Sequence, residues 1–188
     1  MFEKCQTQKF AIAEARVQKR RSRRTSRTDY GLKLKEKQRL RFRYGLRERQ
    51  FSRYVKEAID KKQKISPAEY LFRTLESRLD RVVYQLGFAG SQQMARQLVS
   101  HGHISLDGQV VKVPSCQVKI GEKITIREGS KEKKVFVMLD KKLKEHKPPS
   151  WLSLDPVKKD GELKSPPMLD SMYISSSDIP SVVEFYKK

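Results

Sequence analysis

Between residues 66 and 126 the spacing of apolar residues changes from that of helices to that of strands. Ser66-Pro67-Ala68-Glu69 predicts a helix start, because Ser caps free N–H groups and Pro tolerates the first helical position. Apolar residues then follow three or four positions apart, at Leu71, Leu75, Leu79, Val82 and Leu86. This pattern predicts one continuous helix, or two helices joined near Ser77, and Gly87 ends it.

The next segment predicts a helix followed by a small sheet. Ser91 can cap a helix that Gly102 stops. Ile104 and Leu106 alternate with polar residues, Asp107-Gly108 is typical of a tight hairpin turn, and Val111 and Val113 continue the return strand up to Pro114. Further alternation over 118–120, 124–126 and 135–139 predicts additional strands.

Upstream, residues 29–76 are predicted to be mostly helical. An apolar stripe at i, i+3, i+4, i+7 and i+8 consists of Phe51, Tyr54, Val55, Ala58 and Ile59. From Lys33 to Arg43 basic residues occupy every odd position, which fits a strand, but the residue types are helix formers. We favour a helix there. Residues 140–188 contain most of the eight prolines and no long period, so we expect a poorly structured segment.

Charge is the strongest indication of a partner. The chain of 188 residues has 42 Lys and Arg against 22 Asp and Glu, a net charge of +20. The surplus lies ahead of residue 148, and it is densest between Arg16 and Arg49. Like charges packed this closely repel unless a polyanion neutralises them, which favours nucleic acid over an anionic membrane surface or a merely solvated tail. Residues 1–28 are expected to form a basic arm that orders on its partner.

The composition also excludes several classes of protein. No apolar run is long enough for a membrane span, and the N-terminus has no secretory segment. Two cysteines provide neither a disulfide framework nor a zinc motif, so we expect a reducing compartment. Phosphate-loop, hydrolase-elbow and zinc-protease motifs are absent from the sequence.

We therefore predict no enzyme activity, no cofactor and no metal. His101 and His103 lack a third ligand at suitable spacing, and we interpret them as loop residues. Asp80 is interpreted as part of a helix-surface ion pair with a neighbouring arginine, and Tyr44 could either stack on a base or belong to the core.

Three stretches of the chain resemble a known family. Residues 77–128 (SRLDRVVYQLGFAGSQQMARQLVSHGHISLDGQVVKVPSCQVKIGEKITIRE) are similar to an S-four-type RNA-binding domain, in which two helices and a small sheet form an αL motif. Residues 29–58 (DYGLKLKEKQRLRFRYGLRERQFSRYVKEA) resemble the helical domain of the bacterial-type small-subunit ribosomal protein S-four family. The sequences PSWL at 149–152 and VEFY at 183–186 resemble the C-terminal segment of that family.

The resemblance implies an α+β fold in which a small RNA-binding module is inserted into a helical lobe. The expected divisions are a basic arm at 1–28, the helical lobe at 29–76, the module at 77–140 and a C-terminal segment at 141–188 that returns to the helical lobe. The region ahead of Tyr30 departs from the family pattern, as do residues 155–178.

The resemblance also implies a function. The family binds small-subunit ribosomal RNA and nucleates assembly of the subunit body. Its members contact ribosomal proteins S-five and S-twelve in connection with translational accuracy, and they line the messenger RNA entry path with S-three and S-five. Location in a cytoplasmic or organellar ribosome follows. The RNA-contacting candidates carried over by position are Arg39, Arg41, Arg43, Arg47, Arg49, Arg53, Arg73, Arg78, Ser91, Gln92, Arg96, His101, His103 and Lys112.

Two alternatives use the same module. One is an RNA-modifying enzyme in which the module is the targeting part. The other is a heat-shock-type factor that binds ribosomal particles transiently. The segments outside residues 77–128 are short for a catalytic domain, which favours the structural protein.

Overall fold

A computed structural model describes residues 8, 12–13, 28–61, 64–131, 133, 136, 139, 143, 145–168 and 178–187. The chain divides into two units, Met1–Leu32 and Lys33–Lys188. In the first unit Thr28 begins a helix, because its Oγ1 accepts a hydrogen bond from the Gly31 N–H at 3.2 Å. Most of the predicted basic arm lies outside the described residues.

Over residues 28–61 and 64–76 the structure describes three helices: α2 (Asp29–Arg43), α3 (Glu48–Asp60) and α4 (Pro67–Glu76). The helical interpretation of 33–43 is confirmed, so residue type outweighs alternation there. Ser66 caps α4 by accepting a hydrogen bond from the Glu69 N–H at 3.2 Å, as predicted. Phe51, Val55 and Ala58 of the predicted stripe are buried.

The long apolar stripe forms two helices, α4 and then α5 (Leu79–Gln85), which is followed by α6 (Gln92–Ser100). The break at Ser77 has a clear cause, because backbone groups there pair with a distant segment. The Val118 N–H donates to the Ser77 carbonyl and the Leu79 N–H to the Cys116 carbonyl, each at 2.8 Å. The same pairing corrects the predicted strand over 118–120, which lies beside this break and not in the main sheet.

The sheet is antiparallel, and its strands lie in the order β2-β1-β3-β5-β4. Their bounds are β1 (Ile104–Leu106), β2 (Gln109–Val110), β3 (Lys123–Ile126), β4 (Leu152–Asp155) and β5 (Asp160–Leu163). The hairpin turn at Asp107-Gly108 is confirmed, with φ of 44° and 81°. β2 is shorter than predicted, since Val111 and Val113 both lie beyond its end.

Two predictions for the C-terminal part are corrected. Phe136 and Leu139 have helical backbone instead of the predicted strand, while Val135 and Val137 lie outside the described residues. Residues 140–188 are also more regular than expected, because they contribute β4, β5 and α9 (Asp178–Lys187). The prolines there do not prevent this, and Pro156 itself lies in the turn that joins β4 to β5.

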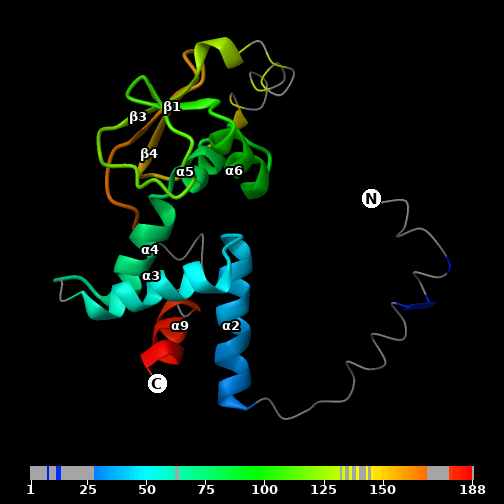
Figure 1. Cartoon of the computed structure of the whole chain (residues 1–188), viewed down its shortest axis with the longest axis vertical. Helices are drawn as coiled ribbons and strands as arrows, with labels where there is room; N and C mark the ends of the chain where they lie inside the picture. The colour runs from blue at the N-terminus through cyan, green and yellow to red at the C-terminus, as the bar shows by residue number, and fades with distance from the viewer. Residues whose placement is uncertain are drawn as a thin grey trace. The chain divides into compact units, whose positions relative to one another are not determined.

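One apolar core connects the helices with the sheet. α9 packs on α3 and α4, and α4 leads from these helices toward α5, α6 and the sheet (Figure 1). The Phe72 and Trp151 rings meet edge to face at 6.1 Å. Leu86 packs closely against Gly161 of β5, and its side chain occupies the space that a Cβ at this position would need.

The predicted α+β class is confirmed. Among the described helices, none has the length and apolar character required to cross a membrane.

Candidate nucleic-acid interface

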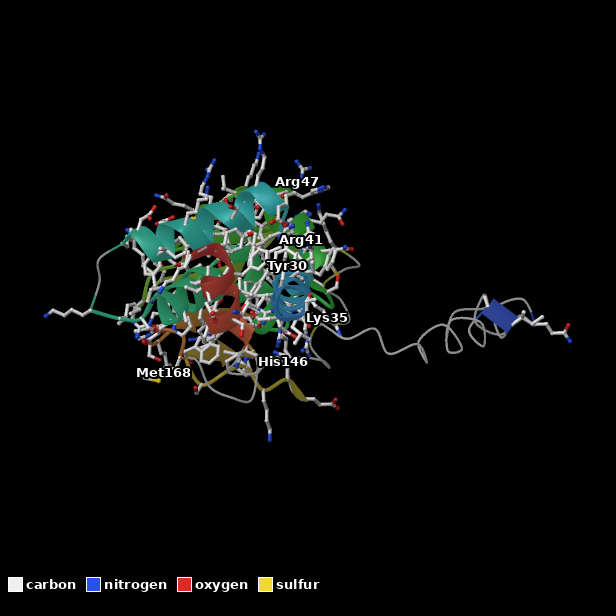
Figure 2. All side chains as sticks on the ribbon, turned by 90° about the horizontal axis from the view of Figure 1, so that it is seen from below. Tyr30, Lys35, Arg41, Arg47, His146 and Met168 are labelled. Atoms are coloured by element: carbon white, nitrogen blue, oxygen red, sulfur yellow. The ribbon has the colours of Figure 1, made fainter. Side chains whose placement is uncertain are left out.

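Exposed basic side chains gather where α2 ends and α3 begins. We call this the α2–α3 basic surface; it consists of Arg39, Arg43, Arg47, Arg49, Arg53 and Lys56, all exposed. Arg49, Arg53 and Lys56 follow one face of α3, opposite the buried residues, and line a depression of about 620 Å³. Figure 2 shows Arg47 at the start of α3 and side chains with nitrogen at their tips projecting outward from this helix.

Arg41 lies at the border of this surface. Its side chain is only 20% exposed, and its Nε lies 3.6 Å from Oε2 of Glu48. Lys37 and Tyr186 also donate hydrogen bonds to Glu48, at 2.6 and 2.9 Å. Partial burial opposes ionisation of Glu48, but these hydrogen bonds and the two positive charges lower its pKa below the ordinary 4.5. The carboxylate therefore ties α2, α3 and α9 together.

Five of the predicted residues on the module lie in or beside α6: Ser91, Gln92, Arg96, His101 and His103. Ser91 caps the helix by accepting a hydrogen bond from the Met94 N–H at 3.2 Å. Both side-chain amide atoms of Gln92 are buried without a hydrogen-bond partner in the structure. At the far end, exposed His101 and partly buried His103 have ring centroids 6.1 Å apart.

The aliphatic chain of Lys112 lies beside Gly102, the residue between the two histidines in the sequence. Burial and the positive charges of Lys133, His101 and Arg127 lower the pKa of His103 below the ordinary 6.5. Its Nδ1 lies 2.9 Å from the Ser130 Oγ. No group of three metal-ligating residues occurs within the described ranges.

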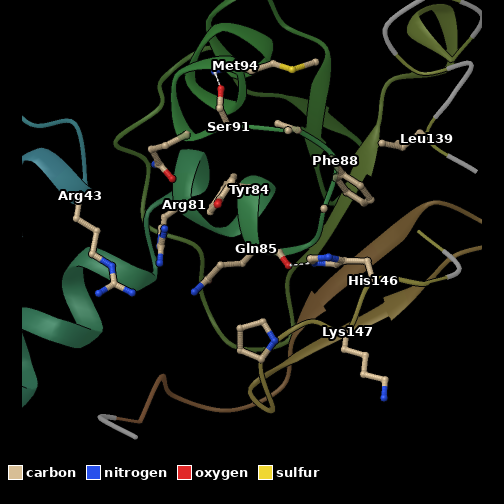
Figure 3. Close-up of a pocket in the computed structure, with 15 residues that line it drawn as sticks. Arg43, Arg81, Tyr84, Gln85, Phe88, Ser91, Met94, Leu139, His146 and Lys147 are labelled. Carbon is tan, nitrogen blue, oxygen red and sulfur yellow. Dashed lines mark hydrogen bonds between the residues drawn. The ribbon is translucent and has the colours of Figure 1, made fainter. Parts of the chain in front are cut away.

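A cavity of about 710 Å³ lies between the end of α2 and the start of α6. Arg43, Ser91, Gln92 and Lys147 are among its lining residues. His146 closes one side, where its Nε2 lies 2.7 Å from the Gln85 carbonyl oxygen (Figure 3). Arg43, a predicted RNA contact at the end of α2, therefore lies at the same opening as the predicted contacts Ser91 and Gln92.

Arg78 and Arg96 have different surroundings from those expected of phosphate contacts. Arg78 is 2% exposed, and its Nε and Nη2 donate to Asp80 at 3.0 and 2.7 Å. Arg96 donates to the same carboxylate, and also to the Gly45 and Tyr44 carbonyls at 2.7 and 3.2 Å. The ion pair expected at Asp80 is present, but Asp80 is fully buried and not on a helix surface. Arg73 is half-exposed and pairs with Glu69 at 2.6 Å.

A second buried carboxylate, Glu76, does not stand out in the sequence. Glu76 accepts hydrogen bonds from the Tyr44 hydroxyl at 2.5 Å, from Arg81 at 3.0 Å and from Gln85 at 2.5 Å. Burial and the neighbouring Glu76 charge raise the pKa of Tyr44 well above 10, so Tyr44 is a protonated core residue and not a stacking one. The signal that could reveal this carboxylate is the presence of Glu76 and Asp80 within the apolar run 71–86.

Comparison with known proteins agrees with this arrangement. Residues 2–76 match the ribosomal protein S4/S9 N-terminal domain, and residues 77–124 match the S4 domain. The small ribosomal subunit protein uS4 of Chromobacterium violaceum is 45% identical over 163 residues, which cover 86% of this chain and 77% of that protein. The uS4 protein of Laribacter hongkongensis is 45% identical over 164 residues, with the same coverage.

A third relative has a similar extent of alignment. The uS4 protein of a Roseiflexus species is 42% identical over 172 residues, covering 89% of this chain and 81% of that protein. The two domain matches meet between Glu76 and Ser77, where α4 ends and the module begins. The chain therefore belongs to the uS4 family of small ribosomal subunit proteins.

Proposed function

We propose that this chain is a structural constituent of the small ribosomal subunit that binds ribosomal RNA. The observation that carries the proposal is the α2–α3 basic surface, where exposed basic side chains lie beside a cavity that reaches the start of α6. Arginine suits such a surface, because its planar guanidinium donates several hydrogen bonds to phosphate oxygens. The names of the relatives support the ribosomal setting.

Recognition in this proposal depends on shape more than on base sequence. The α2–α3 basic surface and the turn of His101, His103 and Lys112 provide contacts on two parts of one fold. The buried carboxylates of Glu76 and Asp80 hold α2, α4, α5 and α6 together, so the contacts keep a fixed geometry. Two contact surfaces held rigidly in one fold suit RNA helices that meet at a fixed angle.

The finer parts of the function follow from the family resemblance. We propose that the chain nucleates assembly of the subunit body, contributes to accuracy, and adjoins ribosomal proteins S-five, S-twelve and S-three and the messenger RNA path in a cytoplasmic ribosome. The role is non-enzymatic, so an assay on uridine-containing RNA should yield no modified product.

The dependence of RNA affinity on salt tests the proposal. We expect the logarithm of the association constant for small-subunit ribosomal RNA to fall linearly with the logarithm of salt concentration. The double variant Arg49→Gln/Arg53→Gln should reduce the magnitude of that slope by about 1.4–1.8, because two phosphate contacts are lost. Lys131→Gln is the control, since Lys131 pairs with Glu128 at 2.8 Å away from α3. An affinity that is independent of salt would refute the proposal.

A further inference from the structure

An aromatic side chain stands exposed within the α2–α3 basic surface. Phe42, the last residue but one of α2, is 69% exposed. The Arg41 guanidinium lies over its ring, 4.5 Å from the centroid. One face of the ring is thus covered by a cation, and the exposed area belongs to the other face and the edge. Because the ring is exposed to solvent, it does not contribute to the apolar core.

The backbone under Phe42 is firmly held. The Gly45 N–H donates to the Phe42 carbonyl and the Leu46 N–H to the Arg41 carbonyl, each at 3.0 Å, while Gly45 has φ of +58°. These hydrogen bonds form a Schellman motif, which closes the helix end. Arg96 then fixes the same turn to α6 through the Gly45 carbonyl at 2.7 Å. The ring is therefore presented from a fixed position.

The surroundings of Phe42 favour an anionic aromatic ligand over an apolar protein surface. Arg39 and Arg43 are exposed on the same helix end, and Arg47 follows in the next loop. A protein-docking patch needs several contiguous apolar side chains. Leu32, the nearest other large exposed apolar residue on α2, is ten positions earlier in the sequence.

We propose that Phe42 is a stacking platform for one unpaired base of the bound RNA. The base lies on the open face of the ring, Arg41 stays on the opposite face, and the neighbouring arginines contact the flanking phosphates. Aromatic side chains bind bases in this manner with little dependence on sequence, because every base has a π face. This inference rests on the proposed RNA-binding function, and it assigns a base contact where that function requires only phosphate contacts.

The test uses the full chain and two RNA probes. The first is small-subunit ribosomal RNA, and the second is a blunt RNA duplex without unpaired bases. Phe42→Leu keeps an apolar side chain and a good helix former, while Phe42→Tyr keeps the ring. We expect Phe42→Leu to weaken binding of the ribosomal RNA about 5- to 100-fold at constant salt, without changing the slope against salt. Binding of the duplex should stay the same, and Phe42→Tyr should bind the ribosomal RNA like the wild type.

A fluorescent variant gives a direct measurement. The chain has one tryptophan, Trp151, which is 2% exposed. Added ribosomal RNA should quench the fluorescence of Phe42→Trp, whereas that of the wild type stays constant. Val157→Ala is the control for loss of an exposed apolar side chain, since Val157 is 86% exposed in the turn between β4 and β5.

The results of these experiments test the stacking inference and the proposed RNA-binding function separately. If the wild type binds ribosomal RNA and Phe42→Leu binds it equally well, the stacking inference is wrong and the RNA-binding function stands. The stacking inference is also wrong if Phe42→Leu binds naked RNA normally but enters reconstituted subunits poorly, because Phe42 would then contact a protein. If the wild type itself does not bind RNA, the proposed function fails.

Discussion

Replacing Asp80 by asparagine removes a negative charge from a fully buried position where two guanidinium groups meet. Asp80 accepts hydrogen bonds from Arg78 at 3.0 and 2.7 Å and from Arg96 at 3.0 and 2.9 Å. Asparagine has nearly the same shape, but its NH₂ group would face a guanidinium N–H. The variant therefore leaves the Arg78 charge buried without its counter-ion.

The size of the effect follows from the burial of the partners. Arg78 is 2% exposed, and removing one partner from a buried ion pair costs about 3–5 kcal/mol. The Arg96 side chain is 33% exposed, so water can compensate its loss, and we expect the lower part of that range. Asp80→Asn should lower the free energy of unfolding by about 3–4 kcal/mol.

Urea unfolding at pH 7, followed by circular dichroism, measures this loss as a shift of the midpoint at constant slope. Glu128→Gln is the matched control, because Glu128 pairs with Lys131 on the exposed surface and its loss should leave the midpoint in place. A decrease of less than about 1 kcal/mol for Asp80→Asn would show that the carboxylate does not compensate the buried arginine.

Two further predictions concern stability. The pKa of Glu48 is lower in the folded chain than its ordinary 4.5, so its contribution to the free energy of unfolding is present above pH 4.5 and is lost as pH falls through the folded-state pKa. Glu48→Gln should therefore make the free energy of unfolding depend less steeply on pH in that range. A steeper dependence would contradict the assignment. Gly161→Ala should destabilise the chain by about 1–3 kcal/mol, because the new methyl group meets Leu86. A thermal midpoint equal to that of the wild type would show that Leu86 can move aside without cost.

Local signals in the sequence predicted local structure well. Ser66 and Ser91 cap α4 and α6 with the expected hydrogen bonds, and Asp107-Gly108 turns between β1 and β2. Each of these depends on residues three or four positions apart, so the sequence contains the whole cause. The division of the apolar stripe at Ser77 depends instead on pairing with residues 116–118, which spacing alone does not reveal.

Long-range pairing explains the remaining differences. Asp80 was expected on a helix surface, but Arg96 and the turn at Gly45 enclose it from other elements. The sequence shows that Arg78 and Arg96 are positively charged, but it does not show that the Asp80 carboxylate pairs with both of them in the fold. Residues 152–163 form strands because β3 offers them a pairing edge, although their own alternation is too short to predict one.

The order of strands has a consequence for folding during synthesis. β3 pairs with β1, which precedes it, and with β5, which the ribosome produces only later. Until Asp160–Leu163 emerges, β3 is an edge strand whose free N–H and C=O groups can join another nascent chain. A chain truncated before Trp151 would keep this open edge permanently, and we expect such a fragment to aggregate although it retains every residue of the matched S4 domain.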